Sequence, residues 1–124
     1  MKALTTLIIL LCASVAFAQE KSEKKYLSIS DELSEKEQKK FMREISDIFR
    51  YPAKARQNGI EGVVKIEFAI NPDGSASDFR ILQGVDPDLD EEGIRALKRV
   101  SENTRWKKSD SIRWILFPFK FKLG

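Results

Sequence analysis

The sequence predicts a single α+β domain behind an export signal. Three observations predict the fold: strict alternation of apolar and polar residues over Val63–Ile70, apolar residues at helical spacing before and after that stretch, and alternating aromatic residues near the C-terminus. The predicted order is a helix, a short helix, a β-hairpin, a helix and a last strand. The chain has 124 residues, of which 42% are hydrophobic, so it is long enough for one domain with its own core.

Residues 1–18 have the parts of a secretory signal peptide. Lys2 gives a positive start, Leu7–Ala13 is a continuous apolar run, and small residues flank Phe17 in the sequence Ala16-Phe17-Ala18. We expect export to the periplasm with cleavage after Ala18. The alternative is an uncleaved inner-membrane anchor, although the apolar stretch is shorter than the ~20 residues that a spanning helix needs.

Residues 19–33 are polar and predict a flexible leader, because Lys, Glu and Ser dominate them. A helix is predicted over residues 34–50, where Ser34 and Glu37 have the spacing of a capping box. Its apolar residues share one face: Phe41, Met42, Ile45, Ile48 and Phe49. This face favours packing on the core, and docking on a partner or a membrane is the alternative.

A short helix and a hairpin come next in the predicted domain, which covers residues 51–124. Pro52 suits the first position of a helix, and Gly59 suits the position just after its end. The strand Val63–Ile70 then enters the turn Asn71–Gly74, whose Pro and Gly have the φ values that a tight turn requires. A second strand over Ser75–Gln83 completes the hairpin.

A third helix is predicted over Asp86–Val100. We expect Asp90 to be its N-cap, with Leu89 and Ile94 forming a hydrophobic staple across it. The alternating acids before this helix resemble a calcium loop, but the Gly and Glu that such a loop needs at its sixth and twelfth positions are missing. Capping of the helix therefore explains these acids better than metal binding.

The last predicted strand runs over Ile112–Leu123. Its apolar residues share one face: Ile115, Phe117, Phe119, Phe121 and Leu123. Pro118 lies within it, and a proline has no N–H to donate to a neighbouring strand. The sequence therefore predicts an edge strand with one unpaired side.

Composition excludes several classes of function. The chain has no His, which removes the Ser-His-Asp and Cys-His nucleophile systems, and a single Cys, which removes an intramolecular disulfide and a zinc finger. The net charge is only +3, so nucleic acid is not an expected partner. The acids Glu61, Glu67, Asp73 and Asp78 match no catalytic motif and are expected to be solvated. We expect no enzymatic activity, no cofactor, no metal and no small-molecule substrate.

Six segments stand in an order and spacing that resemble those of a known family, the TonB C-terminal domain. They are Tyr51–Arg56, Gly59–Gly62, Val63–Phe68, Asn71–Gly74, Leu89–Glu91 and Phe117–Leu123. The resemblance implies a three-stranded antiparallel sheet with two helices on one face, to which residues 34–50 add an N-terminal helix. It also implies a periplasmic protein-binding module that engages an outer-membrane transporter, or another envelope protein, in TonB-dependent transport.

In that family, an extended segment of the transporter adds as a strand to the exposed edge of the sheet. The resemblance therefore implies that the partner pairs with the last strand, at Arg113, Trp114, Ile115, Leu116 and Phe117. Tyr51 and Arg56 are further candidates on a helix that faces the partner. The alternative is a structural module that uses the same edge for homodimerisation without energy coupling. An envelope hydrolase or inhibitor is a third candidate, which the missing nucleophile system disfavours.

Overall fold

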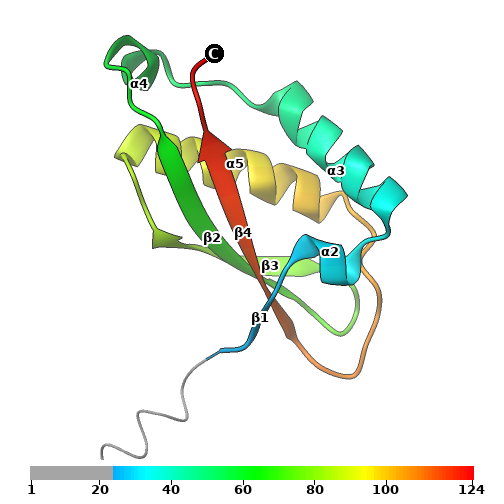
Figure 1. Ribbon diagram of the computed structural model, residues 1–124. Helices are drawn as coiled ribbons and strands as arrows, with labels where there is room; N and C mark the ends of the chain where they lie inside the picture. The colour runs from blue at the N-terminus through cyan, green and yellow to red at the C-terminus, as the bar shows by residue number, and fades with distance from the viewer. Residues whose placement is uncertain (1–23) are drawn as a thin grey trace, which may run out of the picture.

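The computed structural model describes residues 24–124 (Figure 1). The expected signal peptide and the first part of the expected leader lie outside these described residues. In chain order the elements are β1 (Tyr26–Leu27), α2 (Ile29–Glu32), α3 (Glu35–Ile48), α4 (Ala53–Gln57), β2 (Gly62–Ile70), β3 (Ala76–Gln83), α5 (Pro87–Glu102) and β4 (Arg113–Phe121). The order predicted from residue 34 onward is confirmed, with boundaries that differ by one or two residues at most ends.

The sheet has four strands in the order β1-β4-β2-β3 and is mixed. The expected sheet had three antiparallel strands, and that expectation is wrong. Strand β2 is antiparallel to both β3 and β4, as expected, but β1 lies parallel to β4 with Tyr26 opposite Trp114 and Leu27 opposite Ile115. The backbone donors and acceptors on the outer side of β4 can form hydrogen bonds with a further strand, and β1 of the same chain provides that strand.

The structure differs from the expected flexible leader over residues 24–33, which form β1 and α2. Leu27 and Ile29 pack against the core, and Leu33 is buried with 4% of its surface exposed. These apolar residues stand among many charged ones, so the average composition of the segment concealed them. Glu32 also faces Arg113 at the start of β4, at 3.4 Å between Oε1 and Nε.

The core lies between one face of the sheet and the helices α3 and α5, which run across that face (Figure 1). The inward residues of β2 are completely buried: Val64, Ile66, Phe68 and Ile70. Phe41 of α3 packs its ring at 5.9 Å from the rings of both Trp106 and Phe117, which confirms that α3 serves the core. Met42 differs from this expectation, because 48% of its surface is exposed.

The predicted N-terminal cap is confirmed for α3 and wrong for α5. The capping box of α3 is confirmed: Glu37 N–H donates to Ser34 Oγ at 3.3 Å, and Ser34 N–H donates to Glu37 Oε1 at 3.0 Å. Hydrogen bonding to the Glu37 carboxylate from the side chain and the backbone N–H of Ser34 lowers the pKa of this carboxyl.

For α5 the predicted N-cap was wrong. The cap is Asp86, whose carboxylate accepts from the N–H groups of Asp88 and Leu89 at 3.0 and 3.3 Å. Pro87 then occupies the first turn, where a missing N–H has no consequence. Asp90 instead accepts a hydrogen bond from Val85 N–H at 2.9 Å.

Candidate functional site

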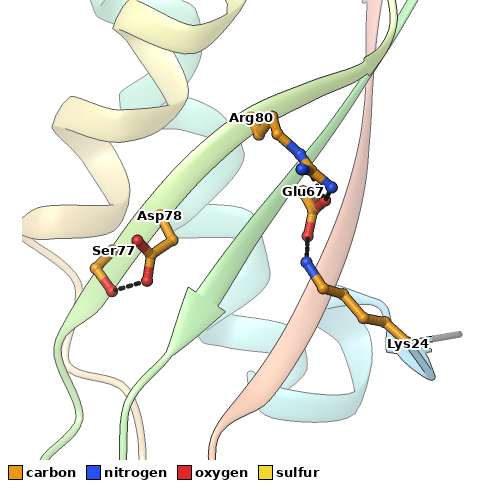
Figure 2. Close-up of polar contacts among 5 residues, drawn as sticks. All are labelled: Lys24, Glu67, Ser77, Asp78 and Arg80. Atoms are coloured by element: carbon orange, nitrogen blue, oxygen red, sulfur yellow. Dashed lines mark hydrogen bonds and ion pairs between the residues drawn. The ribbon is translucent and has the colours of Figure 1, made fainter. Parts of the chain in front are cut away.

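The β3 edge of the sheet is irregular. Its pairing with β2 passes from Glu67 opposite Arg80 to Ala69 opposite Ser77, so β3 has one more residue than β2 over this interval. The extra residue is accommodated at Asp78, which has φ +58° and accepts a hydrogen bond from Ser77 Oγ at 3.1 Å (Figure 2). A bulge of this kind bends an edge strand and interrupts its row of hydrogen-bonding groups, so this edge is poorly suited to strand addition.

The β4 side of the sheet is regular. Every residue from Arg113 to Phe121 pairs one-to-one with β2, from Ile70 back to Gly62. On its other side β4 pairs with β1 at Trp114 and Ile115 alone, and beyond them no strand of residues 24–124 lies against it. Pro118 falls in this uncovered part, which is where a residue without an N–H is tolerated.

An apolar groove with a volume of about 550 Å³ borders the uncovered part of β4. Its floor is the stretch Leu116–Lys120 of β4. One wall is the start of α2 with Ile29, and the other is the face of α3 that carries Met42 and Ile45, together with Phe49 just after the helix. A backbone edge beside an apolar groove can accept an extended peptide, because the edge supplies hydrogen bonds and the groove receives side chains.

The structure brings the five predicted edge residues together but gives them different surroundings. Ile115 and Phe117 face the helices and are buried, with 0% and 5% of their surfaces exposed. Trp114 and Leu116 are half-buried and face the other side of the sheet. Arg113 is held by Glu32 and donates a hydrogen bond to the Lys107 carbonyl, so its side chain already has partners within the fold.

The other two predicted residues do not line the groove. Tyr51 precedes α4, at the end of the sheet where Gly62 pairs with Phe121, and Figure 1 shows β1 at the opposite end. The Tyr51 ring packs edge-on against Phe121 at 5.8 Å, and its hydroxyl donates to the Ile60 carbonyl. Tyr51 therefore serves the fold. Arg56 is exposed on α4.

Glu67, opposite Leu116 in the pairing of β2 with β4, is a candidate that the sequence did not reveal, and its expected solvation is wrong: only 1% of its side chain is exposed. Figure 2 shows its carboxylate between Arg80 and Lys24. Arg80 donates to Oε1 from Nε and Nη2 at 3.1 and 2.6 Å, and Lys24 donates to Oε2 at 2.9 Å. Burial raises the pKa of this carboxyl, but the two cations outweigh it, and the net shift is downward.

The alternation of β2 places Glu67 on the outer face of the sheet, and a polar residue on that face is expected to be solvated. Its burial depends on the strand register, which sets Arg80 beside it, and on the N-terminal segment, which delivers Lys24. The Lys24 ammonium also lies 3.7 Å from the centre of the Trp114 ring. This arrangement links the outer face of β4 to the N-terminal segment through a cation.

Over residues 24–124, no three His, Cys, Asp or Glu side chains gather in a way that would hold a metal ion. Within the same range, no helix combines the length and the apolar character that crossing a bilayer requires.

Known proteins are similar to this chain in both sequence and fold. A curated relative, protein TonB of Helicobacter pylori strain J99, is 32% identical over 80 residues, which are 64% of this chain and 28% of the relative. The chain thus spans under a third of that protein's length. Two solution structures of fragments of the Helicobacter pylori TonB C-terminal domain are each 28% identical to it.

The longer fragment superimposes with a TM-score of 0.61 over 74% of this chain and 85% of the fragment. The shorter gives 0.57 over 72% and 96%. The family model of the Gram-negative bacterial TonB protein C-terminal matches residues 49–123, from the end of α3 to just beyond β4. The chain therefore belongs to the TonB C-terminal domain family.

Proposed function

We propose that this chain is an exported protein-binding module of the bacterial envelope. In this proposal its domain stands in the periplasm and engages an outer-membrane transporter, or another envelope protein, as part of TonB-dependent transport. The family is non-enzymatic, and the chain is not an enzyme. Binding occurs by strand addition: an extended segment of the partner pairs with the outer side of β4.

The observation that supports this proposal most strongly is the regular, partly uncovered edge of β4 beside the apolar groove. The parallel pairing of β1 with Trp114 and Ile115 supports it as well, since this edge already accepts a strand. The bulged β3 edge has no comparable row of groups. Of the predicted residues, Leu116 is then the first one available to a partner without any rearrangement.

A proline substitution at Leu116 tests the proposal. Backbone groups alternate along a strand, so Leu116 has the same orientation as Pro118, whose missing N–H belongs on the unpaired side. The Leu116→Pro chain should fold but lose its capture of outer-membrane proteins from solubilised Gram-negative envelopes. Circular dichroism reports on folding, and a photo-crosslinker at Lys120 reports whether the captured protein lies along β4.

The matched control is Leu116→Ala, which shortens the same side chain and keeps the N–H. Capture retained by Leu116→Ala and lost by Leu116→Pro identifies backbone pairing. A folded Leu116→Pro chain with undiminished capture would overturn the proposal. Sizing of the purified chain tests the alternative, since a homodimer that Leu116→Pro converts to a monomer would show that the edge serves self-association.

A further inference from the structure

The edge of β4 already holds a ligand-like segment, and that segment is the chain's own. Residues 24–27 run parallel to β4, with Tyr26 opposite Trp114 and Leu27 opposite Ile115. Leu27 packs against the core beside Ile115. Tyr26, on the alternate face of an extended segment, shares the outer side of the sheet with Trp114. The segment thus combines backbone pairing with side chains on both faces, as a bound peptide does.

Lys24 adds a third contact two residues before Tyr26. Its ammonium bonds to Glu67 (Figure 2), at 2.9 Å from Oε2. The same ammonium lies 3.7 Å from the centre of the Trp114 ring, and the Lys24 side chain is 32% exposed. A carboxylate and an aromatic face on the same side of a cation form a recognition site for a Lys or Arg side chain.

The chemistry of Glu67 makes this site selective. Its carboxylate is almost completely buried, and Arg80 bonds to one of its two oxygens, Oε1. Lys24 bonds to the other, Oε2. If the Lys24 ammonium left, a buried carboxylate oxygen would lose its donor, which is unfavourable unless another donor replaces it. A segment that displaces residues 24–27 therefore binds best if it brings its own cation.

The N-terminal segment is held lightly enough to leave. Strand β1 has only two residues. The helix that follows is anchored separately: Ser28 N–H donates to Asp31 Oδ2 at 2.9 Å, Leu33 is buried, and Glu32 faces Arg113. Residues 24–27 can consequently detach at Ser28 while α2 stays in place.

We propose that residues Lys24–Leu27 are a self-ligand that competes with the partner for the start of β4. The site formed by Glu67, Trp114 and Ile115 selects an extended segment with a basic residue, any residue, an aromatic residue and then an aliphatic one. This inference rests on the proposed strand addition and deepens it. It gives the chemistry of the incoming segment, and it states that the chain's own N-terminal segment inhibits partner binding by competition. Displacement of the self-ligand exposes the edge from Trp114 to Lys120 as one continuous surface.

The test uses a fluorescent peptide with the sequence of residues 22–29 and the full chain. In the double variant Lys24→Ala/Leu27→Ser the self-ligand is released, and the peptide should bind about tenfold more tightly than to the unaltered chain, because the edge is no longer occupied. The matched control is Lys25→Ala, an exposed neighbour without a role in the site, which should bind the peptide as the unaltered chain does. A peptide with Ala in place of its first Lys should bind the released chain several-fold more weakly.

Equal affinity of the released and unaltered chains for the peptide would overturn the inference, and so would equal binding of the Ala-substituted peptide. Should the double variant melt below the assay temperature, Lys24→Ala alone, which keeps Leu27 in the core, answers the same question. The peptide assay needs no envelope protein. If the released chain binds the peptide more tightly but no envelope protein is captured, the proposed function alone is rejected. If an envelope protein is captured but the released and unaltered chains bind the peptide equally well, the self-ligand alone is rejected.

Discussion

Arg80 on β3 donates two hydrogen bonds to a single oxygen of Glu67 on β2, from Nε at 3.1 Å and from Nη2 at 2.6 Å. The two residues are directly opposite each other in the strand register. The Glu67 carboxylate is buried, and the Arg80 side chain that covers it is 66% exposed. Because the buried Glu67 carboxylate bonds to Arg80 in its ionised form, the stability of the sheet should depend on pH.

The pH dependence of stability should reveal this pair. Burial raises the pKa of Glu67, but hydrogen bonds from Lys24 and Arg80 outweigh it, so the folded pKa lies below the ordinary value of 4.5. The unfolded chain then takes up its proton first as the pH falls. The stabilisation is complete above about pH 4.5 and is lost as the pH drops through the lowered folded pKa. Urea unfolding of the unaltered chain and of Glu67→Gln should show a difference in unfolding free energy that shrinks in this acidic range.

The variant Arg80→Gln serves as the companion to that experiment. It removes the cation from Oε1, so the folded pKa of Glu67 should rise and the acid-induced loss should begin at higher pH. A Glu67→Gln chain with the same pH profile as the unaltered one would contradict this account.

The turn between β2 and β3 should tolerate no side chain at Gly74. Gly74 has φ +88°, and a Cβ built there would lie 2.8 Å from the Trp106 carbonyl oxygen. Gly74→Ala should therefore destabilise the chain by about 2 kcal/mol or more, since backbone strain and a steric clash act together. Thermal and urea unfolding provide the measurement, and Gly74→Val should be worse still.

Gly59 is the matched control for that turn. It has a similar φ of +64°, but a Cβ there would meet nothing within 4 Å. Gly59→Ala isolates the strain, and we expect a loss of about 1 kcal/mol. Equal losses at the two glycines would show that the Trp106 carbonyl moves aside without consequence.

Gly93 lets α5 approach the sheet closely. A Cβ at this buried position would lie 3.3 Å from Ile66 Cδ1 and 3.6 Å from the Phe121 ring. Gly93→Ala gains up to about 1 kcal/mol of helix propensity but tightens a contact with the flexible end of Ile66, so its net effect should be within about 0.5 kcal/mol of zero. Gly93→Leu should cost about 2 kcal/mol or more by overpacking. Urea denaturation of both variants checks this contrast, and a well-tolerated leucine would refute it.

The capping box of α3 should be worth a measurable part of the stability. Ser34→Ala removes the hydroxyl that accepts from Glu37 N–H, and we expect a loss of about 1 kcal/mol in the free energy of unfolding. Ser46→Ala, at an exposed position in the last turn of the same helix, should have the opposite sign and raise stability by a few tenths of a kcal/mol. Equal melting temperatures for the two variants would contradict the assignment of Ser34 as the cap.

The sequence by itself determined the elements whose signals are local. The alternation over Val63–Ile70 produced β2, the Asn71–Gly74 turn produced the hairpin, and the Ser34 capping box marked the start of α3. The resemblance to the TonB C-terminal domain was equally accessible, because six short segments in fixed order are properties of the linear chain. Side-chain period and turn chemistry act over a few residues, so they can be read without a fold.

Only the tertiary structure decided the features that depend on residues far apart in sequence. Residues 24–33 form a strand and a helix because Leu27, Ile29 and Leu33 pack against apolar residues of β4 and α3. The polar residues around these three in the sequence give no indication of that packing. Glu67 is buried because the register of β2 with β3 places Arg80 beside it, and because the N-terminal segment brings Lys24 across the sheet. The position of a charge on a strand is a local property, whereas its burial and its partners arise from the strands that assemble around it.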